Sequence, residues 1–239
     1  MHHTYDDLQK RWKSLRGQSD LTVREVACGM GARTLLCAEI GDALAPAVTI
    51  SAGMHGDEPA GTVALFELAQ HQELPSGFRY RLWPCINPTG YDAGTRESAG
   101  GVDLNRTFAR GGSAPESRAI LTANRDLQFE LALDLHEDCD MPGFYCYEYG
   151  SRELGNAVVD ALAANGMPLA TEPVLRPDPK EEELAIGGRS YTLALARRAA
   201  RSALTLETPG GIDRERRAAI LRIAVKAAID ALSKITNHG

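Results

Sequence analysis

The hydrophobic pattern of this sequence is dominated by three short apolar segments. Each of them ends in, or is followed by, side chains that can take part in chemistry. They are VTISA at 48–52, LALDLH at 131–136 and SALTLE at 202–207. Their length and their content of β-forming residues predict buried strands. In open α/β sheets, ligands bind at the carboxyl ends of the strands. We therefore expect His136, Glu207 and the turn after residue 52 to lie at one edge of a sheet.

The rest of the chain alternates between helix-like and strand-like segments. Apolar positions at steps of three and four predict helices, and short runs of β-formers predict further strands. The predicted helices cover residues 5–16, 60–71, 115–129, 153–165, 191–201 and 214–235, and the further strands cover 21–28, 34–40, 78–86 and 144–149. A long loop is predicted at 91–108. Residues 171–187, with three prolines and consecutive glutamates, are predicted as an exposed excursion with a solvated acidic face.

This order predicts a single α/β domain over residues 1–239, with a twisted, mixed and mostly parallel sheet flanked by helices. Alternation of strand, turn and helix favours parallel pairing. Gly29 and Gly31, between the first two strands, predict an antiparallel hairpin at one edge of the sheet. The aromatic segment 144–149 fits either an ordinary edge strand or the wall of a pocket.

Composition and charge narrow the class of protein. Hydrophobic residues make up 44% and charged residues 24%, which is typical of a globular protein, and the net charge of −6 comes without a basic stripe that would bind nucleic acid. No apolar run is long enough to span a membrane, and the polar amino terminus lacks the apolar core of a signal peptide. Five cysteines without a CxxC pair favour a reducing compartment. We expect a cytoplasmic protein without nucleic-acid or membrane partners; the sequence does not indicate an oligomeric state.

His55 and Glu58 lie three residues apart in a turn bracketed by glycines. Zinc accepts imidazole nitrogen and carboxylate oxygen, and a catalytic zinc uses three protein ligands and an open position for water. The pair alone is better explained as a surface histidine and an acid favoured by the dipole of the following helix. His136, which could also be a structural histidine, supplies the missing third ligand. The three residues together predict a site for one zinc ion.

The glycine-rich segment 91–108 carries a second set of polar residues. It contains Arg96, Asp103, Asn105 and Arg106. Two arginines, an amide and an acid suit a site that binds a carboxylate and polarises a carbonyl group. The alternative is a solvated, charged loop.

A carboxylate ends the third apolar segment. Strand alternation would put its leucines on one face and Thr205 and Glu207 on the other. A carboxylate within such a segment costs free energy unless it faces a polar cleft. The alternative is an ion pair with Arg214 or Arg216, just downstream.

Taken together, these segments resemble the zinc carboxypeptidase superfamily, which includes succinylglutamate desuccinylases, aspartoacylases and murein tripeptide amidases. The resemblance covers roughly residues 45–235 and rests on an ordered set of motifs, which is more specific than any one of them. The motifs are GMHGDE at 53–58, NPTG at 87–90, Arg96 followed after six residues by DLNRTF at 103–108, PESRAI at 115–120, DLHED at 134–138 and TLETP at 205–209. The stretch GMHGDEPAG is most similar to the desuccinylase and amidase branches.

The resemblance also implies roles for individual residues. The implied zinc ligands are His55, Glu58 and His136. Glu207 matches the family's general base, and Arg96 would lie near the scissile carbonyl. Asn105 and Arg106 would hold the free carboxylate of the substrate. The family's mobile active-site tyrosine has no clear counterpart, and Tyr191 is the candidate.

The implied function is zinc-dependent hydrolysis of an amide bond in a small substrate with a free carboxylate, such as an N-acyl amino acid. A metallocarboxypeptidase acting on short or murein-derived peptides is the first alternative. A zinc-binding relative without catalysis is the second, although the filled catalytic positions argue against it. The third is an α/β binding protein whose histidines are structural.

Overall fold

A computed structural model describes residues 4–18, 20–29, 33–185 and 189–236, and an eight-stranded sheet runs through them. The strands in chain order are β1 (Thr22–Val26), β2 (Leu35–Ile40), β3 (Ala47–Ala52), β4 (Arg79–Trp83), β5 (Phe129–Asp138), β6 (Phe144–Tyr149), β7 (Leu169–Leu175) and β8 (Ala200–Pro209). Their order in the sheet is β1-β2-β4-β3-β5-β8-β6-β7. The pairs β3–β4, β3–β5, β5–β8 and β6–β7 are parallel, whereas β1–β2, β2–β4 and β6–β8 are antiparallel. The predicted mixed, mostly parallel sheet is confirmed.

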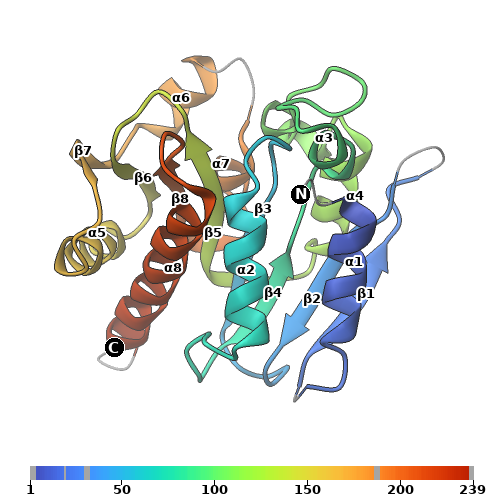
Figure 1. The fold of residues 1–239 in the computed structure, drawn as a ribbon, viewed down its shortest axis with the longest axis horizontal. Helices are drawn as coiled ribbons and strands as arrows, with labels where there is room; N and C mark the ends of the chain where they lie inside the picture. The colour runs from blue at the N-terminus through green and yellow to red at the C-terminus, as the bar shows by residue number, and fades with distance from the viewer. Residues whose placement is uncertain (1–3, 19, 30–32, 186–188, 237–239) are drawn as a thin grey trace.

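Helices cover both faces of this sheet, so that the described residues form one α/β domain. The helices are α1 (Tyr5–Ser14), α2 (Ala60–Gln70), α3 (Pro88–Ala93), α4 (Pro115–Ala123), α5 (Leu154–Ala164), α6 (Pro179–Ala185), α7 (Tyr191–Ala196) and α8 (Arg214–Thr236). In Figure 1, α1, α2, α5 and α8 lie on the near face, and α4 and α7 lie behind the sheet. Each layer has its own buried apolar cluster, with Trp12 and Leu221 in the first and Phe108 and Leu195 in the second.

The three apolar segments that dominate the sequence form adjacent parallel strands, β3, β5 and β8, in the middle of the sheet. Successive side chains of a strand point to opposite faces. The leucines of β5 therefore join the cluster beneath α2 and α8, while Asp134 and His136 share the other face. The register pairs His136 with Glu207, so these two residues lie side by side. The predicted meeting of strand ends is confirmed.

The edges of the sheet differ in part from the sequence prediction. The antiparallel pairing of β1 with β2 agrees with the predicted hairpin, although residues 30 and 31 of its turn lie outside the described residues. The aromatic segment 144–149 forms β6, between β8 and β7. The interpretation of this segment as an ordinary edge strand is therefore wrong.

Two helices end earlier than their apolar periodicity suggests. Helix α4 stops at Ala123 and α7 at Ala196, whereas the predictions extended to residues 129 and 201. The Phe129 amide donates to the Ala199 carbonyl oxygen at 2.7 Å, and Phe129 pairs with Ala200 in the sheet. The predicted helix ends are wrong because Phe129 and Ala200 are the first residues of β5 and β8 and pair with each other in the sheet.

Two stretches predicted without regular structure contain helices. Helix α3 occupies the start of the expected loop; the Asn87 side chain accepts a hydrogen bond from the Gly90 amide at 2.9 Å, and Pro88 suits the first turn. The expected excursion at 171–187 instead forms much of β7 and all of α6. Asp178 starts α6, because its carboxylate accepts from the Lys180 amide at 2.7 Å.

None of the helices in the described part of the chain has both the length and the apolar character that crossing a membrane requires. The 23-residue helix α8 instead buries one stripe, which includes Leu221 and Val225, against the sheet. A cytoplasmic location stays a prediction.

Candidate metal centre and active site

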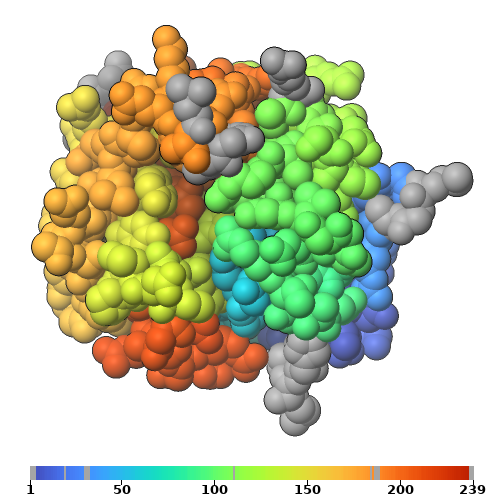
Figure 2. Space-filling view, turned by 90° about the horizontal axis from the view of Figure 1, so that it is seen from above, coloured from blue at the N-terminus to red at the C-terminus, as the bar shows by residue number. Residues whose placement is uncertain are grey.

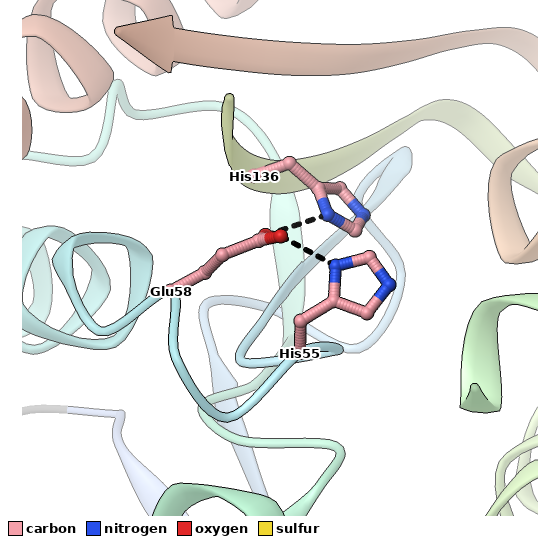
Figure 3. Close-up of side chains that lie close together, drawn as sticks. All are labelled: His55, Glu58 and His136. Carbon is pink, nitrogen blue, oxygen red and sulfur yellow. Dashed lines mark hydrogen bonds and ion pairs between the residues drawn. The ribbon is translucent and has the colours of Figure 1, made fainter. Parts of the chain in front are cut away.

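Three buried side chains converge at the carboxyl ends of β3 and β5. His55 and Glu58 belong to the turn between β3 and α2, and His136 lies near the end of β5. One potential ligand atom from each lies within 4.8 Å of the others. The Nδ1 atom of His55 is 2.5 Å from Oε1 of Glu58, and Nδ1 of His136 is 2.9 Å from Oε2 (Figure 3). The fold thus places together the three residues that the sequence predicts as ligands.

The far nitrogens of both imidazoles contact other carboxylates. Nε2 of His136 lies 3.0 Å from Asp134, whose second oxygen accepts a hydrogen bond from the Ser51 hydroxyl at 2.6 Å. Nε2 of His55 lies 3.3 Å from Asp103. A carboxylate that accepts the Nε2 proton leaves Nδ1 as the lone-pair donor, which is how metal-binding histidines are commonly oriented. The set of donors and their orientation fit a zinc site.

The electrostatics of the cluster also favour a cation. Burial alone would lower the pKa of His136, but Asp134 and Glu58 raise it well above the ordinary value. Burial opposes ionisation of Glu58, yet the neighbouring histidines lower its pKa to about 2. A buried cluster that stabilises positive charge on its imidazoles and negative charge on its carboxylate is suited to a metal ion.

The turn that carries His55 packs tightly against α3. The Gly56 amide donates to the Thr95 carbonyl oxygen at 2.9 Å. A Cβ atom on Gly56 would lie 1.9 Å from the carbonyl carbon of Gly90, so no larger residue fits there without moving the backbone. This contact explains why a glycine directly follows the histidine, and it fixes the position of His55.

Arg96 lies beside the metal-ligand candidates. Its guanidinium nitrogens are 3.3 Å from Nδ1 of His55, 3.6 Å from Glu58 and 3.1 Å from Asp103. Its side chain is 42% exposed, so it is accessible to a ligand. The arginine therefore places a positive charge next to the two ligand candidates His55 and Glu58.

Asn105 and Arg106 lie on a short 3-10 helix, Leu104–Arg106, and line the same cavity as the two histidines. The side-chain oxygen of Asn105 accepts from the Tyr191 amide at 3.0 Å, which leaves its NH₂ group as the donor for a ligand. The Arg106 guanidinium donates to the backbone carbonyl oxygen of Asn105 at 3.2 Å. The cavity has a volume of about 380 Å³. Figure 2 shows it as a hollow between the green segment and the yellow and orange segments.

Glu207 faces this cavity from β8. In the described part of the chain its carboxylate has no hydrogen bond or ion pair; Arg214 pairs with Glu215 instead. Burial, with smaller contributions from Glu58 and Asp138, raises the pKa of Glu207 to about 7. A carboxylate with a raised pKa is a stronger base than an ordinary one.

Sequence reasoning missed some residues of the site and misplaced one. Tyr145 and Tyr147 of β6 line the cavity, as expected for a pocket wall, and the Tyr145 hydroxyl donates to Asp138 at 2.7 Å. Asp134 could have been found from its position, two residues before His136 on the same strand face. Tyr191 is 1% exposed and packs against Phe108 in the core, so it does not act in this cavity.

The described residues form an α/β domain in which a buried cluster of two histidines and a glutamate lies at the carboxyl ends of adjacent parallel strands. The chain belongs to the succinylglutamate desuccinylase/aspartoacylase catalytic domain family, whose sequence profile matches residues 45–234. This match spans most of the sheet and all the candidate residues discussed above.

Three comparisons illustrate the range of similar proteins. Carboxypeptidase SOL1 from Arabidopsis thaliana is 29% identical over 160 residues, or 56% of this chain, and murein peptide amidase A from Escherichia coli K12 is 46% identical over 59 residues, or 25% of this chain. The matched residues span 33% of the first relative and 24% of the second. The crystal structure of an inferred metallopeptidase from Shewanella amazonensis superposes with a TM-score of 0.76 at 23% identity, over 97% of this chain and 92% of the other. That likeness shows the fold.

Proposed function

We propose that this chain is a zinc-dependent hydrolase that cleaves an amide bond in a small substrate bearing a free carboxylate. The observation that carries the proposal is the convergence of His55, Glu58 and His136 in a cavity that Glu207 also lines. Membership of the desuccinylase and aspartoacylase family favours an N-acyl amino acid as substrate. A short or murein-derived peptide is the second candidate, and the match to murein peptide amidase A favours it.

The metal-ligand candidates, Glu207 and Arg96 have different roles in the proposed hydrolysis. A zinc ion held by the two histidines and Glu58 would supply a Lewis acid that polarises a carbonyl and makes water acidic near neutral pH. Glu207 takes a proton from the attacking water and delivers it to the leaving amine. Arg96 stabilises the negative charge that develops on the carbonyl oxygen, which is worth about 3–4 kcal/mol for one well-placed donor.

Arg106 and Asn105 select the substrate in this proposal. A guanidinium group can hold a carboxylate through two parallel hydrogen bonds, and the Asn105 NH₂ group adds a further donor. The Arg106 guanidinium has no acidic partner within ion-pair distance in the described residues, and its one hydrogen bond there goes to the backbone carbonyl oxygen of Asn105. It is therefore free to bind a substrate carboxylate.

A substrate panel tests the proposed activity. Zinc-loaded protein should release amine from at least one class among N-acyl amino acids, dipeptides and γ-glutamyl peptides, and the C-terminally amidated forms should be poor substrates. Amine release, measured with and without a chelator, gives the result. Zinc binding without any amine release would favour a non-catalytic relative instead.

Replacing Arg106 with methionine should reduce kcat/KM for a free-acid substrate about ten- to a hundredfold, the range for a hydrogen bond to a charged group. The effect should appear mainly in KM, and the preference for the free acid over its amide should disappear. Arg152→Met is the matched control, because Arg152 is exposed and does not line the cavity. Unchanged discrimination in Arg106→Met would remove this residue from carboxylate recognition.

A further inference from the structure

The mechanism above leaves several acidic side chains of the cavity wall without a role, and Glu182 is one of them. Glu182 lies on α6, which forms part of the orange rim of the hollow in Figure 2. Its two glutamate neighbours behave differently: Glu181 is exposed, and Glu183 pairs with Arg189 and Arg197 at 2.8 and 2.6 Å. Glu182 alone among these three glutamates lines the cavity.

The surroundings of Glu182 leave its negative charge without a close counterion. The Tyr149 hydroxyl donates to its carboxylate, and within the described residues no basic side chain lies within ion-pair distance. Burial raises its pKa, and the hydrogen bond from Tyr149 and the charge of Arg106 oppose this shift only in part. A partly buried carboxylate in this state is stabilised when a cation binds beside it.

Arg106 and Glu182 line the same cavity but are not paired with each other. The cavity thus presents to a ligand a cationic group, Arg106, and an anionic group, Glu182, neither of which has an ion-pair partner among the described residues, and this pattern complements a molecule that carries both a carboxylate and an ammonium group. Acidic side chains also outnumber arginines around the cavity. The acids are Asp57, Glu58, Glu137, Asp138, Asp140, Glu182 and Glu207, and the arginines are Arg96 and Arg106.

We propose that Glu182 is a specificity-determining residue that binds an ammonium group of the substrate. The preferred leaving group is then a diamino acid: its carboxylate contacts Arg106, one amino group is in the scissile amide, and the other pairs with Glu182. This inference rests on the proposed function and selects, among its substrates, those with a free amino group over purely acidic N-acyl amino acids. If Glu182 instead serves only as a counterion to Arg106, its loss changes binding of all carboxylate ligands alike.

The test compares ligands that differ only in the ammonium group. Nα-acetyl-lysine is paired with Nα-acetyl-norleucine, and alanyl-lysine with alanyl-norleucine. Calorimetry measures their binding to the zinc-loaded Glu207→Gln protein, in which turnover should be strongly slowed. In at least one pair the lysine ligand should bind about ten- to a hundredfold more tightly, as for one hydrogen bond to a charged group.

Adding Glu182→Gln to this protein should abolish the preference for lysine while leaving binding of the norleucine ligands within about twofold, because a neutral amide retains the shape but not the charge. Adding Glu181→Gln, which removes the same charge from an exposed neighbour, should preserve the preference. Equal binding of both ligands in both pairs, no binding of either lysine ligand, or a preference that survives Glu182→Gln would overturn the inference.

Turnover by the wild-type protein separates this inference from the proposed function. A lysine preference in binding without amine release would contradict the hydrolase and leave ammonium recognition by Glu182 standing. Amine release with equal kcat/KM for both ligands of each pair would support the hydrolase and contradict the role of Glu182.

Discussion

The Glu207→Gln protein is expected to bind zinc like the wild type and to turn over substrate about a hundredfold to ten-thousandfold more slowly, the range for loss of a general acid–base group. Glutamine preserves the size of the side chain but cannot accept and return a proton. Zinc binding should persist because Glu207 is not one of the three converging ligand candidates. The partly buried carboxylate has no hydrogen-bond or ion-pair partner among the described residues, so its replacement should also spare the fold.

The measurement is kcat at matched zinc content, with Glu215→Gln as control. Glu215 is 76% exposed at the start of α8 and carries the same charge, so its replacement should leave turnover unchanged. Equal turnover by wild type and Glu207→Gln would show that another group moves the proton.

Replacing His136 with alanine is expected to abolish zinc binding and, with it, turnover. The change removes one of three ligands and leaves Asp134 and Glu58 buried without their shared partner. Metal content after dialysis and circular dichroism together measure the result. His71→Ala is the control, because His71 is exposed at the end of α2 and should be replaceable without effect.

A milder substitution controls for the case in which His136→Ala loses zinc because its structure is generally disturbed. Asp134→Asn keeps the shape of the strand but replaces the acceptor that orients His136, and it should weaken zinc binding about ten- to a hundredfold. Zinc affinity equal to wild type in both variants would contradict the proposed site.

The sequence predicted the parts of this molecule that follow from strand periodicity and strand ends. The apolar segments that form β3, β5 and β8 could be placed because buried parallel strands are nearly continuous apolar runs. Since such strands deliver their carboxyl ends to one edge, the sequence alone was enough to expect a shared site for His55, His136 and Glu207. Alternation along β8 also placed Glu207 on the face opposite the leucines.

Features that depend on long-range packing could not be predicted. Glu182 looked like part of a solvated acidic run, because nothing local distinguishes it from Glu181 and Glu183. Its place in the cavity arises from the packing of α6 against Tyr149. Tyr191 was a candidate for the cavity but lies in the core, since its ring packs against Phe108 on the far layer.

The predicted boundaries of two helices were wrong for a related reason. The periodic pattern of 115–129 continues past Asn124, but pairing of Phe129 with Ala200 takes the end of this segment into the sheet. Local propensity is a weak guide where sheet pairing competes for the same residues. The start of α3 is different, because the Asn87–Pro88 capping signal is local and could have been recognised.

We propose that His55, Glu58 and His136 together hold one zinc ion. Anomalous diffraction at the zinc absorption edge, from crystals of the zinc-loaded protein, tests it most directly. We expect one strong peak per chain, about 2.0–2.2 Å from one nitrogen of each histidine and from a carboxylate oxygen of Glu58. A peak elsewhere, or a fully loaded protein without density between these three side chains, would contradict it.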